Sequence, residues 1–137
     1  MAHEKFRAEV LTPDGKVFDE EVELVSTRTA LGSIGVLAHH EPVLAILDPT
    51  ELRLYRSDSD VVSFAQSEGY LQVANNEALL LVEEAHSPDQ LDAGVLRQRL
   101  EEAERELEQA KDDTEKRRVA ERDKRRWERF LEIAERS

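Results

Sequence analysis

The sequence of 137 residues contains no cysteine, and its apolar runs are short. The absence of cysteine excludes disulfides, thiolate metal sites and thiol catalysis, and it is consistent with a reducing compartment. Apolar runs of a handful of residues, as at 78–82, are too short to span a membrane. The first ten residues, MAHEKFRAEV, lack the basic and then apolar order of a signal peptide. We therefore expect a soluble cytosolic protein.

The motifs of common enzyme classes are also missing. The sequence contains no phosphate-binding GxxxxGK loop, no GxGxxG and no GxSxG elbow. The adjacent histidines His39 and His40, followed by Glu41, would point to opposite sides of a strand and would share a metal only within a loop. A small metal-dependent β-barrel enzyme that uses these three residues is therefore the weakest reading, and a non-enzymatic module is favoured.

The formal net charge is −12, which disfavours unaided binding to nucleic acid or to an anionic membrane surface. The charge is unevenly distributed, with −10 in residues 1–86 and −2 in residues 87–137. The periodicity of apolar residues changes at the same place. We therefore predict two domains, with the boundary between residues 86 and 87.

The first half has the period-two pattern of β-strands. Apolar and polar residues alternate at 6–10, 52–54 and 71–73, and residues 78–82 are compatible with a strand buried on both faces. Turn signals separate these runs: Pro13-Asp14-Gly15, Ser57-Asp58-Ser59-Asp60 and Asn75-Asn76. This spacing predicts short antiparallel strands in a β-sandwich or flattened barrel.

The second half has a helical period. Ser87 is a candidate cap, with Pro88 at the first helical position and Asp89 in the first turn. One apolar stripe is expected on the first helix, formed by Leu91, Val95, Leu100, Ala103, Leu107 and Ala110. A turn at residues 112–114, with Thr114 as a possible cap, leads to a second helix with Val119, Trp127, Phe130, Leu131 and Ala134. The short connection predicts an antiparallel helical hairpin.

Charges are sorted between the two predicted helices. The first carries a run of glutamates, whereas residues 115–129 have a net charge of +4. This arrangement fits either a solvated pair of helices joined by weak ion pairs or a basic helix that meets an acidic partner. Between Thr114 and Arg126 the only apolar side chains are Val119 and Ala120, so we predict that the second helix undocks or extends in some states.

The segment STRTALGSIGVLAHHEPVLAIL resembles the N-domain of the epsilon subunit of the F-type ATP synthase. That family has a G-x-x-G-[IV]-x-x-x-H-x-P pattern, matched here by Gly32, Gly35, Val36, His40 and Pro42. The opening FRAEVLTPDGKVFDEEVELVSTRT and the later SEGYLQVANNEALLLVEEA also resemble the family. An acidic residue that often lies between the two glycines is replaced by Ser33.

This resemblance implies an α+β protein with a β-sandwich and a C-terminal two-helix hairpin, located in the central stalk. The implied partners are the gamma subunit, the ring of c subunits and the alpha and beta catalytic subunits. The protein would lie on the cytoplasmic face of the cell membrane, peripherally, through the complex. The implied contacts to gamma and the c-ring are made by Gly32, Ser33, Gly35, His40 and Pro42. The subunit would have no chemistry of its own but would couple proton flow to ATP synthesis.

The resemblance also implies that the hairpin inhibits ATP hydrolysis, through basic residues that meet an acidic segment of beta. The residues that match this role are Arg118, Arg122, Arg125, Arg126 and Arg129. Some members bind ATP as a regulatory ligand through an [IL]-D-x-x-R-A motif and arginines of the second helix. Leu91 and Asp92 open that motif here, and Arg125 and Arg129 are one turn apart. Because Val95 and Leu96 replace the Arg-Ala pair, we expect neither bound ATP nor another cofactor.

A different class of binding module also places a helical hairpin on a β-domain. Transcription or chaperone factors insert such a coiled coil into a channel, often with acidic residues at the hairpin tip, where Asp112 and Asp113 are expected here. Those factors usually carry the hairpin first in the chain, whereas here it comes last. Co-purification with a gamma subunit would separate the two readings.

Overall fold

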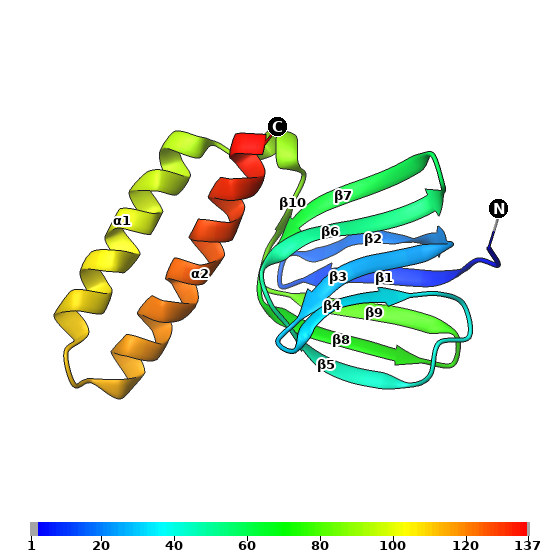
Figure 1. Ribbon diagram of the computed structural model, residues 1–137, viewed down its shortest axis with the longest axis horizontal. Helices are drawn as coiled ribbons and strands as arrows, with labels where there is room; N and C mark the ends of the chain where they lie inside the picture. Colours follow the sequence, from blue (N-terminus) through cyan, green and yellow to red (C-terminus); the bar gives the residue numbers. More distant parts are fainter. Residues whose placement is uncertain (1–2, 137) are drawn as a thin grey trace. The chain divides into compact units, whose positions relative to one another are not determined.

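The computed structural model describes residues 3–136 and divides the chain into two compact units that meet between Ser87 and Pro88. This boundary is one residue later than the one expected from the sequence. The first unit consists of β-strands and the second of helices (Figure 1). The strands are β1 (Phe6–Thr12), β2 (Gly15–Val22), β3 (Leu24–Thr29), β4 (Gly32–Val36), β5 (Val43–Leu47), β6 (Thr50–Ser57), β7 (Asp60–Gln66), β8 (Gly69–Ala74), β9 (Glu77–Val82) and β10 (Ala85–His86). The helices are the short 3₁₀ helix η1 (Pro88–Gln90), α1 (Ala93–Ala110) and α2 (Thr114–Arg136).

The strands form one folded sheet in the order β10-β7-β6-β3-β5-β8-β9-β1-β2, with β4 paired to β3 outside this path. The predicted sandwich followed by two helices is confirmed. One detail departs from a purely antiparallel sheet, because β1 pairs in parallel with β9 while it pairs antiparallel with β2. The chain between β1 and β9 is long enough to allow such a parallel pairing.

One face of these strands fills the core. The alternating residues predicted to point inward are buried, with Phe6, Ala8 and Val10 on β1 at most 3% exposed. The same is true of Leu52 with Leu54 and of Leu71 with Val73. The core also contains Phe18, Val22, Val25, Val36, Leu47, Ala78, Leu80 and Val82. Period two therefore identified the buried face of these strands correctly.

The predicted turns are confirmed, and two of them require unusual backbone. Asn75 and Asn76 join β8 to β9 with φ values of 52° and 61°, a conformation that asparagine tolerates better than most residues. Gly15 begins β2 at φ 128°, where a side chain would be strained. The third turn joins β6 to β7 at residues 58–59.

The expectation of a strand buried on both faces at residues 78–82 is wrong. In β9, Ala78, Leu80 and Val82 are buried, but Leu81 is 43% exposed. The strand therefore contributes one face to the core, and its other face is apolar and open. A continuous apolar run gives no information on which of its two faces the rest of the protein covers.

The first long helix begins later than predicted. Residues 88–90 form a single 3₁₀ turn, in which the Leu91 N–H donates to the Pro88 carbonyl at 3.2 Å. Asp92, not Ser87, is the N-cap of α1, and its carboxylate accepts the Val95 N–H at 3.1 Å. At α2, Asp113 replaces the predicted cap Thr114, because its carboxylate accepts the Lys116 N–H at 3.0 Å. Both caps follow the usual pattern of a bond to the third residue of the helix.

The predicted antiparallel hairpin is confirmed, and the predicted stripe on α1 is wrong at one position, where Leu96 is buried in place of Val95. The buried residues of α1 are Leu96, Ala103 and Ala110, whereas Val95 is 41% exposed. On α2, Ala120 and Phe130 are buried as apolar residues, together with Ile133. None of the helices within residues 3–136 combines the length and apolar character needed to cross a bilayer.

Gly69 is the glycine whose side chain would disturb the sheet most. A methyl group there would overlap the backbone oxygen of Leu81 and would lie 2.8 Å from Cα of Val82. We expect Gly69→Ala to lower the free energy of unfolding by about 3 kcal/mol, because the backbone of β9 must shift. Urea unfolding measures this change. Gly35→Ala is the matched control, since its methyl group meets only the Leu24 side chain, at 3.5 Å. Equal effects of the two changes would contradict the prediction.

The cap at Asp92 gives a second test. Asp92→Ala removes the acceptor for the Val95 N–H and should destabilise the first turn of α1 by about 1 kcal/mol. Asp92→Asn should preserve the stability, because asparagine caps as well as aspartate. Hydrogen exchange of the first α1 amides provides the measurement. Asp89→Ala, within η1, is the control and should leave these amides unchanged.

Candidate partner-contact surfaces

An apolar row crosses the outer side of three adjacent strands. Leu44 and Ile46 on β5 are 78% and 60% exposed, Tyr70 on β8 is 57% exposed, and Leu81 lies on β9. Ile46 is paired in register with Tyr70, which in turn is paired with Leu81. We call these four residues the outer apolar face. Monomeric soluble proteins rarely expose neighbouring large apolar side chains in this way, so the face indicates a binding surface.

A shallow cavity continues this face toward β1. It has a volume of about 290 Å³ and includes Tyr70 and Leu81 in its wall. Leu11 on β1 is paired with Leu81 and lines the same cavity together with Pro13. The outer apolar face is therefore an uneven surface, which is the shape that interface side chains pack into.

Several outer residues of β1, β2 and β6 are charged instead. Arg7 donates two hydrogen bonds to the Asp19 carboxylate, at 2.9 and 3.0 Å, and Lys16 adds a third at 2.8 Å. These bonds hold the pKa of Asp19 well below its ordinary value. Arg56 on β6 binds Glu20 on β2 through two bonds of 2.8 and 2.7 Å. This network leaves charged groups satisfied on the surface, in contrast to the uncovered apolar groups of β5, β8 and β9.

The hairpin that joins β3 to β4 carries a leucine at its tip. Leu31 is 100% exposed. The Thr29 hydroxyl fixes the turn, since it accepts the Leu31 N–H at 3.1 Å and donates to the Gly32 carbonyl at 2.9 Å. Gly32 has φ 132°, so the turn requires glycine there. The Ala30 N–H donates to the Ile46 carbonyl at 2.9 Å, which places the tip beside the outer apolar face.

The loop from residue 37 to residue 42 is held by both histidines, in different ways. His39 adopts φ 63°, its backbone N–H donates to Asn76 Oδ1 at 2.7 Å, and its Nε2 lies 2.8 Å from Glu4 Oε2. His40 Nδ1 lies 2.7 Å from the backbone oxygen of Glu41. The two rings therefore have separate partners. In residues 3–136, no three His, Asp or Glu side chains form a group that could hold a metal ion.

The predicted contact residues of this region lie on β4 and on the following loop. Ser33, Gly35 and Pro42 are exposed, while Gly32 and His40 are partly buried. Gly35 has neither a positive φ nor a neighbour that would exclude a side chain, because a methyl group there meets only Leu24, at 3.5 Å. The fold of this chain does not explain this glycine. Close approach of another backbone would explain it.

Four of the predicted arginines form one stripe along α2. Arg118, Arg122, Arg125 and Arg129 follow each other at intervals of three or four residues, which places them on one helical face. Arg126 lies off this stripe and is buried, 8% exposed. Acidic neighbours partly neutralise the stripe. Arg118 donates two hydrogen bonds to Glu115, at 2.6 and 3.2 Å, and holds the pKa of that carboxyl below its ordinary value.

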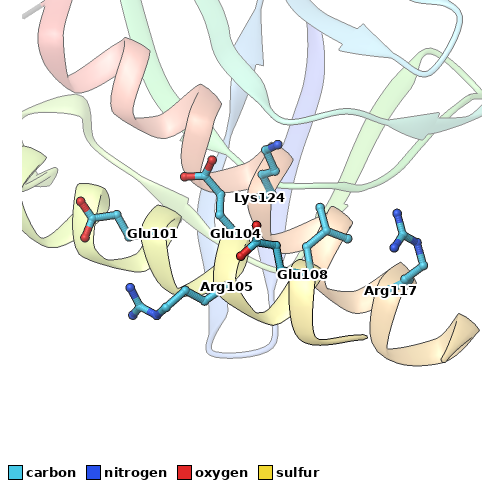
Figure 2. A pocket seen from close by; sticks show the side chains of 7 residues that line it. Glu101, Glu104, Arg105, Glu108, Arg117 and Lys124 are labelled. Carbon is cyan, nitrogen blue, oxygen red and sulfur yellow. The ribbon is translucent and has the colours of Figure 1, made fainter. Parts of the chain in front are cut away.

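A groove of about 600 Å³ runs along the hairpin and is lined by charges of both signs (Figure 2). Its lining residues are Glu101, Glu104, Arg105, Leu107, Glu108, Arg117 and Lys124. The residues considered for ATP lie elsewhere on the hairpin. Asp92 caps α1, and Arg129 binds Glu132 at 3.1 Å. Leu91 precedes α1, and Arg125 belongs to the stripe. That ATP does not bind stays a prediction.

Two of these surface features were missed in the sequence. The outer apolar face had a signal, because residues 43–47 are apolar at every position, and an antiparallel strand open to water on one side alternates instead. Leu31 had a weaker signal, an apolar residue directly before the glycine of a turn. Both signals come from apolar residues that lie outside the core. A search for apolar positions alone does not distinguish such exposed residues from core residues.

Comparisons with known proteins agree with this architecture. Residues 5–88 match the family model described as "ATP synthase, Delta/Epsilon chain, beta-sandwich domain". The chain is 38% identical to the ATP synthase epsilon chain of Halalkalibacterium halodurans over 104 residues, which cover 76% of this chain and 77% of that one. It is 33% identical to the ATP synthase epsilon chain of a Sulfurihydrogenibium species over 129 residues, 94% of this chain and 96% of that one.

Solved structures show the same fold. A chain in the structure of the Euglena gracilis mitochondrial ATP synthase, OSCP/F1/c-ring, matches 98% of this chain and 83% of its own length, with a TM-score of 0.78 and 24% identity. The reading as a channel-inserting factor finds no support in these matches. The resemblance carried by the glycine segment is confirmed, and the chain belongs to the family of ATP synthase delta/epsilon chains, as an epsilon-type chain.

Proposed function

We propose that this chain is a non-catalytic rotor subunit in the central stalk of an F-type ATP synthase. In this role the β-unit anchors the protein to the gamma subunit and to the ring of c subunits. The hairpin reaches toward the alpha and beta catalytic subunits. The protein would lie at the cytoplasmic face of the cell membrane, peripherally, through the complex. The subunit transmits rotation during ATP synthesis and can resist rotation in the direction of hydrolysis.

The observation that carries this proposal is the outer apolar face, formed by Leu44, Ile46, Tyr70 and Leu81. These side chains are exposed in a sheet whose core is already filled by the opposite face of the same strands. Burying them against a partner is the main source of affinity that the β-unit offers. The gamma subunit is the assigned partner, because a subunit that rotates with the stalk needs one interface that stays closed.

The region from Leu31 to Pro42 is assigned to the second contact, with the c-ring. Its glycine at position 35 leaves room for a close approach of backbone, and the turn before it is fixed by Thr29. Ser33, His40 and Pro42 lie in the same stretch and add a weakly polar surface. Such a fixed loop transmits a lateral force without losing its conformation.

The arginine stripe of α2 is assigned to the inhibitory contact with an acidic segment of beta. Arginine suits this contact because its planar guanidinium forms paired hydrogen bonds with carboxylates. The bonds to Glu115, Asp123 and Glu132 within the helix must be exchanged for bonds to the partner. This exchange makes the contact reversible, because both states satisfy the arginines.

The test of the inhibitory role uses the catalytic complex with gamma, stripped of its own epsilon chain. We expect the full chain to bind and to slow ATP hydrolysis. A chain that ends at Ser87 retains the whole core of the first unit and should bind without inhibition. Hydrolysis rates and co-sedimentation give the two readouts. If neither form binds, the proposed place in the stalk is wrong; if the shortened chain inhibits equally, the role of the hairpin is wrong.

The test of the anchor uses Leu44→Ser combined with Ile46→Ser. Both side chains are exposed, so the fold should persist, while affinity for the same complex should fall at least tenfold. Val61→Ser is the matched control, because Val61 is an exposed apolar residue on β7, outside this face. Titration of each variant measures the dissociation constant. Equal affinities of the double variant and the control would assign the anchor to another surface.

A further inference from the structure

The half of the hairpin next to the loop between α1 and α2 buries little apolar volume. The buried residues of α1 are Leu96, Ala103 and Ala110, and two of these three are alanines. In the half of α2 that follows the loop, up to residue 125, Ala120 is the buried residue. Small side chains allow close approach of the helices but bury little area, so this half of the seam contributes little to docking.

The other half of the hairpin buries Leu96, Phe130 and Ile133, and two polar contacts between the helices lie there as well. Arg97 forms an ion pair with Glu135 at 3.0 Å, with both side chains more than half exposed. Exposed pairs of this kind contribute little to stability. The second contact is different in kind, because the Arg99 guanidinium of α1 lies 4.9 Å from the centroid of the Trp127 ring on α2. This distance is within the range of a cation–π interaction.

Trp127 is also held from its own helix. Arg126 lies 5.3 Å from the same ring centroid, and Phe130 meets the ring edge to face at 5.9 Å between centroids. The orientation of the indole is therefore supported by contacts within α2, independently of Arg99. An aromatic ring that is already oriented loses little conformational freedom when a cation from the other helix covers it.

We propose that Arg99 over Trp127 is the latch of the hairpin, which sets the fraction of molecules with α2 docked on α1. Loss of this contact leaves the buried side chains of Leu96, Phe130 and Ile133, the alanine-rich half next to the loop and the exposed Arg97–Glu135 pair to hold the helices. The functional effect of the latch rests on the proposed function, in which undocking of α2 extends the arginine stripe toward the catalytic subunits. The planar guanidinium of arginine stacks on the face of the indole, whereas the ammonium group of lysine cannot, so lysine replaces Arg99 only in part.

The experiment measures docking in the isolated full chain, by hydrogen exchange of α2 amides and by fluorescence. Trp127 is the single tryptophan, so the emission reports the surroundings of this ring. We expect Arg99→Gln to raise the exchange rate along α2 by about two- to fivefold, and Arg99→Lys to have a smaller effect. Arg105→Gln is the matched control, because Arg105 is exposed on the same helix and lines the groove of Figure 2 instead of covering the indole.

A double variant identifies the partner of Arg99. In the Trp127→Phe background, Arg99→Gln should add little, since phenylalanine attracts a cation less strongly than tryptophan does. If Arg99→Gln changes neither exchange nor emission, or acts equally in both backgrounds, the latch is overturned. Inhibition of ATP hydrolysis is measured with the same variants. Faster exchange without a change in inhibition would leave the latch in place and would contradict the inhibitory role of the hairpin.

Discussion

The sheet of the β-unit depends on β1, which hydrogen-bonds to β2 on one side and to β9 on the other and so joins β2 to the remaining strands. β2 follows β1 after a tight turn, whereas β9 arrives about 65 residues later in the chain. The parallel hydrogen bonds between β1 and β9 bring the first and the ninth strand together beside one core. Val10 of β1 and Leu80 of β9 are fully buried there.

A sheet folded around a single core has one inner face, and this determines which side chains its outer face can carry. Once the inner side chains of β5, β8 and β9 fill the core, apolar residues on the other face of the same strands have no place within the unit. Elsewhere on the sheet the outer positions carry salt bridges, such as Arg7–Asp19 and Arg56–Glu20. Folding of this chain alone would allow charged residues on both parts of the outer surface. The apolar residues on β5, β8 and β9 are therefore explained by binding to a partner, not by folding.

Local patterns in the sequence were sufficient for the strands, the turns and the hairpin, because period two, asparagine turns and period 3.6 are short-range effects. Pairing was not predictable, since the alternation at residues 6–10 identifies a buried face but no neighbour. The start of α1 was misplaced because Ser87 and Asp92 are both competent caps. In the predicted stripe Val95 stands in place of Leu96, because two neighbouring apolar residues fit the spacing almost equally well. The exposure of Leu81 depends on what covers β9, and no local pattern records it.

The hairpin follows a different physical rule from the sheet. Near the loop, Ala103, Ala110 and Ala120 bring the helices close without burying much area, so the larger buried side chains Leu96, Phe130 and Ile133 and the polar contacts lie in the other half. A core as large as that of the β-unit would lock α2 in place, and a hairpin without any cross-helix contact would not hold it. The free energy of docking must lie near zero if a partner's acidic segment is to compete for α2. A cation over an indole contributes about 0.5–1 kcal/mol at an exposed site, so loss of Arg99 would shift a docking equilibrium near zero about two- to fivefold, even for a helix of 23 residues.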